Sequence, residues 1–97
     1  MSGDILRGLL TNYGGTITTG GTAQQVIAAN PIRNYLLVQN PSAAPESLFV
    51  DFGEVASTAS IELVPGMTLT FESSFMTTQY VSMYAATTGH AFVIKEG

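Results

Sequence analysis

The chain has 97 residues, of which 45% are hydrophobic and only 10% are charged, and its formal net charge is −4. A chain of this length forms one small domain, and its apolar fraction is sufficient for a hydrophobic core. An average soluble domain has roughly 25% charged residues, so neutral polar residues must form most of this surface. We expect other subunits to cover much of it, because a free monomer usually carries more charge for solubility. The alternative is the neutral surface of an ordinary β-protein.

Charge and composition also exclude several classes of partner. The three basic residues, Arg7, Arg33 and Lys95, are far apart in the sequence, which argues against direct binding of nucleic acid or of an acidic membrane surface. The chain has no cysteine, and therefore neither a disulfide nor a thiolate metal site. No apolar run approaches the roughly 20 residues of a membrane span, and the N-terminus lacks the pattern of a secretory signal. We expect synthesis and folding in the cytoplasm.

Residues 1–13 are predicted to form an N-terminal arm or a short helix, separate from a domain over 14–97. Helical spacing relates four apolar residues of this segment, namely Ile5, Leu6, Leu9 and Leu10. Gly8 interrupts the pattern, and an isolated helix this short is marginal in water. Two interpretations stay open: an arm that becomes ordered on a partner, or a segment that folds back over its own core.

The stretch from 14 to 31 predicts two strands. Threonine and Ile17 between two Gly-Gly pairs favour a strand flanked by turns. These glycines lack the spacing of a phosphate-binding loop. A second strand is predicted over 23–29, anchored by Val26 and Ile27, and Asn30-Pro31 marks the turn that follows.

The centre of the chain predicts a pair of neighbouring core strands. Tyr35 to Val38 is a continuous apolar run, which is typical of a strand covered on both faces. Leu48, Val50 and Phe52 alternate with residues of the opposite face, which indicates a strand with one face inward. The segment between them contains two prolines and can be neither helix nor strand.

Beyond a small-residue loop, four more strands are predicted. Ile61 and Leu63 share one face, the Pro65-Gly66 turn follows, and alternating apolar residues over 67–72 complete what looks like a hairpin. Further strands are predicted over 79–86 and 91–95. The regular spacing of seven or eight strands indicates an all-β sandwich or barrel, and a sandwich buries one face of each alternating strand.

Candidate chemical groups do not form a recognisable catalytic motif. His90, Asp51 and Ser82 could be imagined as a nucleophilic triad, but the chain has no nucleophile elbow. We expect His90 to be a residue at the start of a strand with a local hydrogen bond. Four carboxylates could supply a glycosidase pair, but they lie where strand ends and solvated faces are expected, and no aromatic cluster forms a sugar platform beside them: Asp51, Glu54, Glu62 and Glu72. We therefore expect neither an enzyme nor a metal or other cofactor.

Four tyrosines could line a contact surface or cap the ends of the core: Tyr13, Tyr35, Tyr80 and Tyr84. Tyr80 and Tyr84 face away from Val81, Met83 and Ala85 in the predicted strand. We expect partial exposure and possible partner contact for these two.

Several runs of the chain resemble small virion proteins of tailed bacteriophages. They are Arg-Asn-Tyr-Leu-Leu-Val-Gln-Asn-Pro-Ser, Ser-Leu-Phe-Val-Asp-Phe-Gly, Ser-Ile-Glu-Leu-Val-Pro-Gly-Met-Thr-Leu-Thr-Phe-Glu and Ala-Ala-Thr-Thr-Gly-His-Ala-Phe. The resemblance covers about residues 20 to 97 and consists mainly of strands and turns. It does not separate capsid decoration (cement) proteins from head-fibre or tail-fibre modules, and it implies no catalytic residues.

The resemblance implies a jelly-roll sandwich that decorates the capsid surface of a virion and binds the major capsid protein, as a homo-oligomer with a trimer favoured. The end of the chain shortly after Lys95 favours a stand-alone decoration subunit. The residues expected at the protein interface are Ile5, Leu6, Leu9, Leu10, Tyr13, Tyr80 and Tyr84. The alternatives are a head-fibre or tail attachment module that binds a host receptor or glycan, and a small hydrolase.

Overall fold

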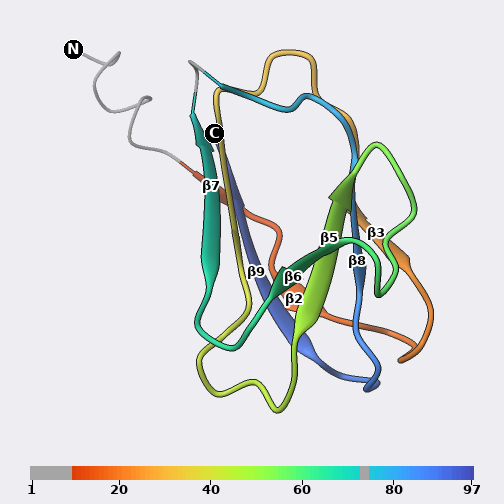
Figure 1. Cartoon of the computed structure of the whole chain (residues 1–97). Helices are drawn as coiled ribbons and strands as arrows, with labels where there is room; N and C mark the ends of the chain where they lie inside the picture. Colours follow the sequence, from red (N-terminus) through yellow and green to blue (C-terminus); the bar gives the residue numbers. More distant parts are fainter. Residues whose placement is uncertain (1–9, 73–74) are drawn as a thin grey trace.

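The computed structural model describes residues 10–72 and 75–97, and over these residues the protein is an all-β sandwich of two antiparallel sheets (Figure 1). The predicted fold class is therefore confirmed. The nine strands of the described residues are β1 (Thr11–Asn12), β2 (Gly15–Thr16), β3 (Gln24–Ile27), β4 (Tyr35–Gln39), β5 (Leu48–Phe52), β6 (Ile61–Leu63), β7 (Thr68–Glu72), β8 (Val81–Tyr84) and β9 (Ala91–Glu96).

The order of the strands is that of a jelly roll. One sheet has the order β1-β9-β4-β7, with β2 also paired to β9, and the other has the order β3-β8-β5-β6. From β2 onward each connection crosses to the other sheet, except the one from β5 to β6. Strands β1 and β2 pair with different parts of β9, so they act as two pieces of one edge strand and the fold has eight strand positions.

The hydrophobic core lies between the sheets and comes from alternate residues of nearly every strand. In β4 the side chains of Leu36 and Val38 are fully buried, and in β5 those of Leu48 and Val50 are. Burial of an aliphatic side chain of this size stabilises a fold by about 1.5–3 kcal/mol. The buried cluster consists of Ile17, Ile27, Leu36, Val38, Leu48, Val50, Leu63, Val81, Met83, Ala85, Phe92 and Ile94.

Two predicted strand pairings are wrong. Strands β4 and β5 lie in opposite sheets, and so do β6 and β7. The predicted turn between β6 and β7 does form: Met67 N donates to Val64 O at 2.9 Å, and Gly66 has a φ of 89°, which glycine adopts without strain. A tight turn reverses the chain, but the hydrophobic alternation on either side is satisfied equally well by pairing within a sheet or by crossing to the facing one.

Three apolar residues that were predicted to be covered lie at the surface of the described structure. Leu37 is half-buried on the outer face of β4, so only one face of this strand is in the core. Ile61 is 46% exposed and Met67 is 43% exposed. Both lie at or beside the outer end of an edge strand, where alternation continues past the part that the opposite sheet covers.

The first sheet begins before residue 14. Thr11 and Asn12 pair with Glu96 and Lys95 of β9, and Tyr13 N donates to Ile94 O at 2.9 Å. The last residues of the predicted arm are thus part of the sheet. Residues 1–9 lie outside the described residues, so an arm or helix there stays a prediction.

Within residues 10–72 and 75–97, no helix is long and apolar enough to cross a membrane.

Candidate functional site

The imagined nucleophilic triad is not assembled. Asp51 and Ser82 are cross-strand partners in β5 and β8, and each is engaged elsewhere: Ser60 Oγ donates to Asp51 Oδ2 at 2.9 Å, and Ala56 N donates to Ser82 Oγ at 3.0 Å. His90 is hydrogen-bonded to Asn40 instead. A nucleophile needs a base within hydrogen-bonding reach, and the described contacts provide none.

The four acidic residues do not form a catalytic or metal-binding cluster in the described structure. Glu62 is exposed and accepts a hydrogen bond from Ser47 Oγ at 2.6 Å. Glu54 is exposed in the loop after β5, and Glu72 lies on β7 in the other sheet. Among the described residues, no group of three or more His, Cys, Asp or Glu side chains could hold a metal ion.

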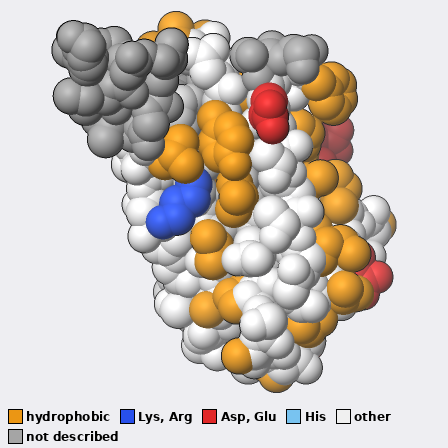
Figure 2. Space-filling model, turned by 90° about the vertical axis from the view of Figure 1, so that its left-hand side faces the viewer, with side chains coloured by type: hydrophobic (Ala, Val, Ile, Leu, Met, Phe, Trp, Pro, Cys, Tyr) orange, Lys and Arg blue, Asp and Glu red, His pale blue; other side chains and the backbone are white. Residues whose placement is uncertain are grey.

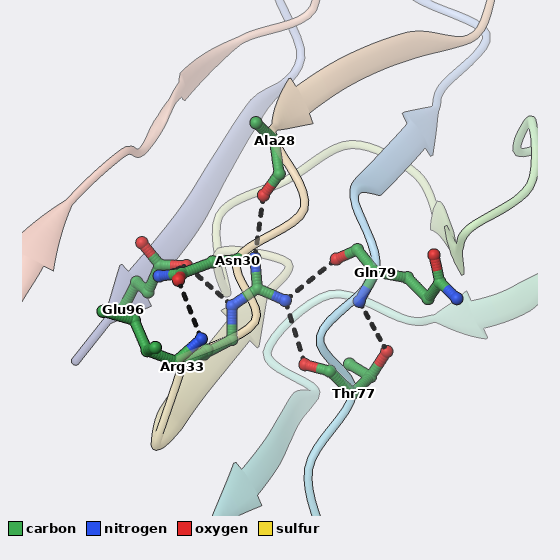
Figure 3. Close-up of polar contacts among 7 residues, drawn as sticks. Ala28, Asn30, Arg33, Thr77, Gln79 and Glu96 are labelled. Atoms are coloured by element: carbon green, nitrogen blue, oxygen red, sulfur yellow. Dashed lines mark hydrogen bonds and ion pairs between the residues drawn. The ribbon is translucent and has the colours of Figure 1, made fainter.

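A buried arginine organises one end of the sandwich. Arg33 lies in the loop between β3 and β4, and only 3% of the residue is exposed. Its guanidinium points toward Glu96 of β9 and toward the chain between β7 and β8 (Figure 3). We call the sandwich end formed by residues 28–34, residues 75–80 and the end of β9 the arginine end.

The guanidinium of Arg33 makes four hydrogen bonds. Nε donates to Glu96 Oε2 at 2.6 Å, and Nη2 donates to Ala28 O at 3.0 Å. Nη1 donates to Thr77 O at 3.0 Å and to Gln79 O at 2.9 Å. A planar guanidinium can satisfy several carbonyls and a carboxylate at once, which an ammonium group cannot do in this geometry. Arg33 therefore ties both connections at this end to the last strand.

A buried histidine lies at the opposite end, where the loop between β4 and β5 meets the connection between β8 and β9. His90 is 3% exposed, and its Nε2 is 2.8 Å from Asn40 Oδ1. His90 directly precedes β9, and its backbone N donates locally to Thr87 O at 3.3 Å, as predicted. The partner of its ring is not local, because Asn40 is 50 residues away. The sequence contains no signal of this contact, which depends on how the two loops meet. We call this the histidine end.

The contacts of Asn40 fix the state of one ring nitrogen of His90. Asn40 Nδ2 donates to Glu46 O at 3.0 Å and to Leu63 O at 2.8 Å, so Asn40 Oδ1 must be the acceptor and His90 Nε2 the donor. The other nitrogen, Nδ1, is buried without a hydrogen-bond partner and lies 3.6 Å from Glu46 Oε2. The carboxylate of Glu46 also accepts hydrogen bonds from Thr87 N at 2.9 Å and from Thr87 Oγ1 at 3.0 Å. These polar groups join the two loops to each other.

A shallow cavity of about 270 Å³ lies beside this network. Most of the side chains that line it are small. The lining residues are Pro41, Ala43, Ala44, Pro45 and residues 87–91. The single carboxylate nearby is already bound by Thr87. This arrangement stabilises the loops and presents few groups that could orient a substrate.

The residues predicted at the interface do not form one cluster. Ile5, Leu6 and Leu9 lie outside the described residues. Leu10 and Tyr13 are 45% and 44% exposed beside the arginine end, where Tyr13 lines a small cavity together with Asn30 and Glu96. Tyr80 is half-buried at the arginine end, directly before β8. Tyr84 is half-buried at the other end of β8 and packs edge-on against Phe49, with ring centroids 6.2 Å apart.

Two exposed apolar side chains at the arginine end were not predicted. Ile32 is 81% exposed and Phe75 is 77% exposed, and their segments are joined by the bond from Asn30 N to Thr78 O at 2.8 Å. Both residues follow a strand-breaking pair, Asn30-Pro31 and Ser73-Ser74. An apolar residue directly after such a break was the available signal in the sequence. With Leu10 and Tyr13, four of the eight exposed large hydrophobic residues among those described lie at this end.

The outer face of the first sheet is largely neutral. Figure 2 shows white and hydrophobic side chains over most of this side of the molecule, with few charged ones. Threonine and half-buried Leu37 and Val93 contribute to it. This agrees with the low charge content of the sequence.

Comparison with known proteins finds no relative: no family model, no curated protein and no solved structure matches the chain.

Proposed function

We propose that this protein is a structural subunit of a tailed-bacteriophage virion, namely a decoration protein that binds the outer surface of the head. Its partner is the major capsid protein, and its action is adhesive: it bridges neighbouring shell subunits and so resists the outward pressure of the packaged DNA. The proposal combines the resemblance of residues 20 to 97 to small virion proteins with the distribution of polar and apolar groups in the fold.

The observation that carries the proposal is the contrast between buried and exposed side chains. The buried polar side chains, Arg33, Asn40, Ser82 and His90, all make hydrogen bonds within the domain. Among the described residues, Ile32 and Phe75 are the most exposed large hydrophobic ones. Exposed apolar side chains on a neutral surface favour protein contact, and we assign the capsid contact to the arginine end.

The test is binding to phage heads that lack this protein. Wild-type protein should co-sediment with DNA-filled heads in copies comparable in number to the major shell subunit. The double variant Ile32→Ser/Phe75→Ser should bind at least about tenfold more weakly, because truncation of interface anchors has effects of this size. Val64→Ser is the matched control, since Val64 is 43% exposed in the turn after β6, where Gly66 N donates to Asn40 O at the histidine end.

The same preparation separates this proposal from the alternatives. A dozen or fewer copies on each particle would indicate a vertex or tail component. Saturable binding of bacterial surface polysaccharide by the isolated protein, without binding to heads, would instead support a receptor-binding or glycan-binding attachment module. Failure to bind heads under conditions where the domain is folded would contradict the proposal.

A further inference from the structure

The edges of the two sheets differ in how well they are protected against pairing with another strand. An exposed edge strand is a template for further pairing, and proteins protect edges with short strands, bulges, proline or lysine. In the described residues, β3 has a register shift between Gln25 and Ile27. Strand β6 has three residues and is followed by Pro65. The opposite edge of the first sheet is split into β1 and β2, of two residues each.

Strand β7 has none of these protections over most of its length. It pairs with β4 in a regular register at all five positions, and it contains neither proline nor lysine. Its single charged residue, Glu72, is at one end, where Phe75 N donates to Glu72 O at 2.8 Å and closes that end. The open part of the edge therefore runs from Thr68 to Phe71, with no described strand beside it.

The direction of the backbone groups follows from the ladder with β4. Asn40 N donates to Met67 O at 3.1 Å, so Met67 faces β4. Backbone groups alternate in direction along an antiparallel strand, which makes Leu69 and Phe71 face β4 as well. The N–H and C=O groups of Thr68 and Thr70 consequently point away from the sandwich.

The outward N–H and C=O groups of Thr68 and Thr70 can pair with the same groups of a second copy that is related by a two-fold axis. If two copies of β7 lie antiparallel with the axis at Leu69, Thr68 of one copy is opposite Thr70 of the other. Each Thr68–Thr70 pair then exchanges two backbone hydrogen bonds, giving four in total. Cross-strand threonine pairs are favourable, and no like charges meet in this register. Shifting the register to place Thr70 opposite itself would bring Thr68 against the closed end at Glu72.

Apolar surface lies on the same side of the sandwich. Strands β6 and β7 are consecutive edge strands of the two sheets, joined by the Pro65-Gly66 turn. Ile61, Val64 and Met67 are 46%, 43% and 43% exposed along this connection. In Figure 2 hydrophobic side chains also lie along the right-hand margin of the molecule. A second copy seated on the edge would have apolar contacts in addition to the backbone hydrogen bonds.

We propose that the exposed edge of β7 pairs with β7 of a second copy of this chain, which joins two sheets into one continuous sheet across a two-fold axis. The contact uses the backbone edge of β7 from Thr68 to Phe71, whereas the proposed capsid contact uses the side chains of Ile32 and Phe75, so different substitutions test the two proposals. It favours a dimer where the resemblance favours a trimer.

The experiment is sedimentation equilibrium of the full chain at increasing concentration. The wild type should show a monomer–dimer equilibrium with a dissociation constant below about 1 mM, as expected for a small interface. The double variant Thr68→Lys/Thr70→Glu should dimerise about tenfold more tightly, because two cross-strand ion pairs form. Thr68→Lys/Thr70→Lys should dimerise at least about tenfold more weakly.

Mixing provides the matched control. The all-lysine variant and Thr68→Glu/Thr70→Glu should each be mostly monomeric, and an equimolar mixture should restore a dimer that contains one copy of each. Circular dichroism of each variant checks that the side-chain changes leave the fold intact. A wild type that stays monomeric at about 1 mM, a closed trimer, or a dimer that these substitutions do not alter would each overturn the proposal.

Discussion

The two ends of the sandwich each contain one buried basic side chain, but the two are held differently. At the arginine end, Arg33 makes four hydrogen bonds, to one carboxylate and three backbone carbonyls. At the histidine end, His90 makes one good hydrogen bond, and its second nitrogen lies 3.6 Å from Glu46. The first network joins both loops at its end to β9, whereas the second depends mainly on Asn40 as an intermediary.

The two ends also differ in the size of the apolar side chains at their surfaces. The arginine end carries Ile32 and Phe75, with more than three quarters of each exposed. Apart from His90, the cavity at the histidine end is lined by alanine, proline, threonine and glycine. A rigid frame beneath large apolar side chains suits a contact surface, because less conformational freedom is lost on binding. This difference supports the proposal that the arginine end is the contact surface, whereas the polar network of the histidine end joins two loops.

The largest effect is expected from removing the guanidinium. Arg33→Met should lower the free energy of unfolding by about 3–5 kcal/mol, because the carboxylate of Glu96 and three carbonyls lose a buried partner. Urea denaturation measures it. Lys95→Met is the control on the outer face of β9 and should change stability by less than about 0.5 kcal/mol. Equal effects of the two substitutions would contradict the role assigned to Arg33.

A smaller effect is expected from breaking the histidine end. Asn40→Ala should lower the free energy of unfolding by about 3 kcal/mol, because two carbonyls and His90 Nε2 lose their partner and unsatisfied buried groups cost about 1–3 kcal/mol each. The side chain of the neighbouring Gln39 donates one hydrogen bond, from Nε2 to Thr68 Oγ1 at the surface. Gln39→Ala should therefore cost less than about 1 kcal/mol. If the loss for Asn40→Ala exceeded that for Arg33→Met, the ranking of the two ends would be reversed.

The smallest effect concerns a close approach of two loops at the histidine end. A Cβ at Gly20 would lie 2.4 Å from Ala86 O and 2.5 Å from Thr88 N, so Gly20→Ala must push backbone segments apart. Overpacking of this kind costs about 1–3 kcal/mol. A Cβ at Gly15 would lie 3.6 Å from the Phe92 ring, an ordinary contact, and Gly15→Ala should change the thermal midpoint little. Tolerance of alanine at position 20 would show that this contact is looser than described.

Hydrophobic alternation and turn residues predicted most of the strands, since period-two patterns and Pro-Gly chemistry are local properties. The turn at Pro65-Gly66 is one example, and the inward faces of Leu48 and Val50 are another. Which strand each one pairs with in its sheet could not be predicted in the same way. In a jelly roll most connections cross between sheets, and a strand that buries one face satisfies its pattern in either sheet.

The candidate surfaces were harder to predict than the strands. The helical spacing of Ile5, Leu6 and Leu9 drew attention to residues that the described structure does not cover. Ile32 and Phe75 are single apolar residues in loops, which sequence periodicity cannot distinguish from core residues. Three of the four partners of Arg33 are 44 to 63 residues away, and the ring partner of His90 is 50 residues away.

The central claim is that the arginine end is the contact surface, and amide hydrogen exchange of the protein free and bound to phage heads tests it most directly. We expect new protection over residues 28–34 and 75–80 on binding, with residues 85–91 at the histidine end unchanged. Protection concentrated at the histidine end, or none at either end in a sample that co-sediments with heads, would contradict the account.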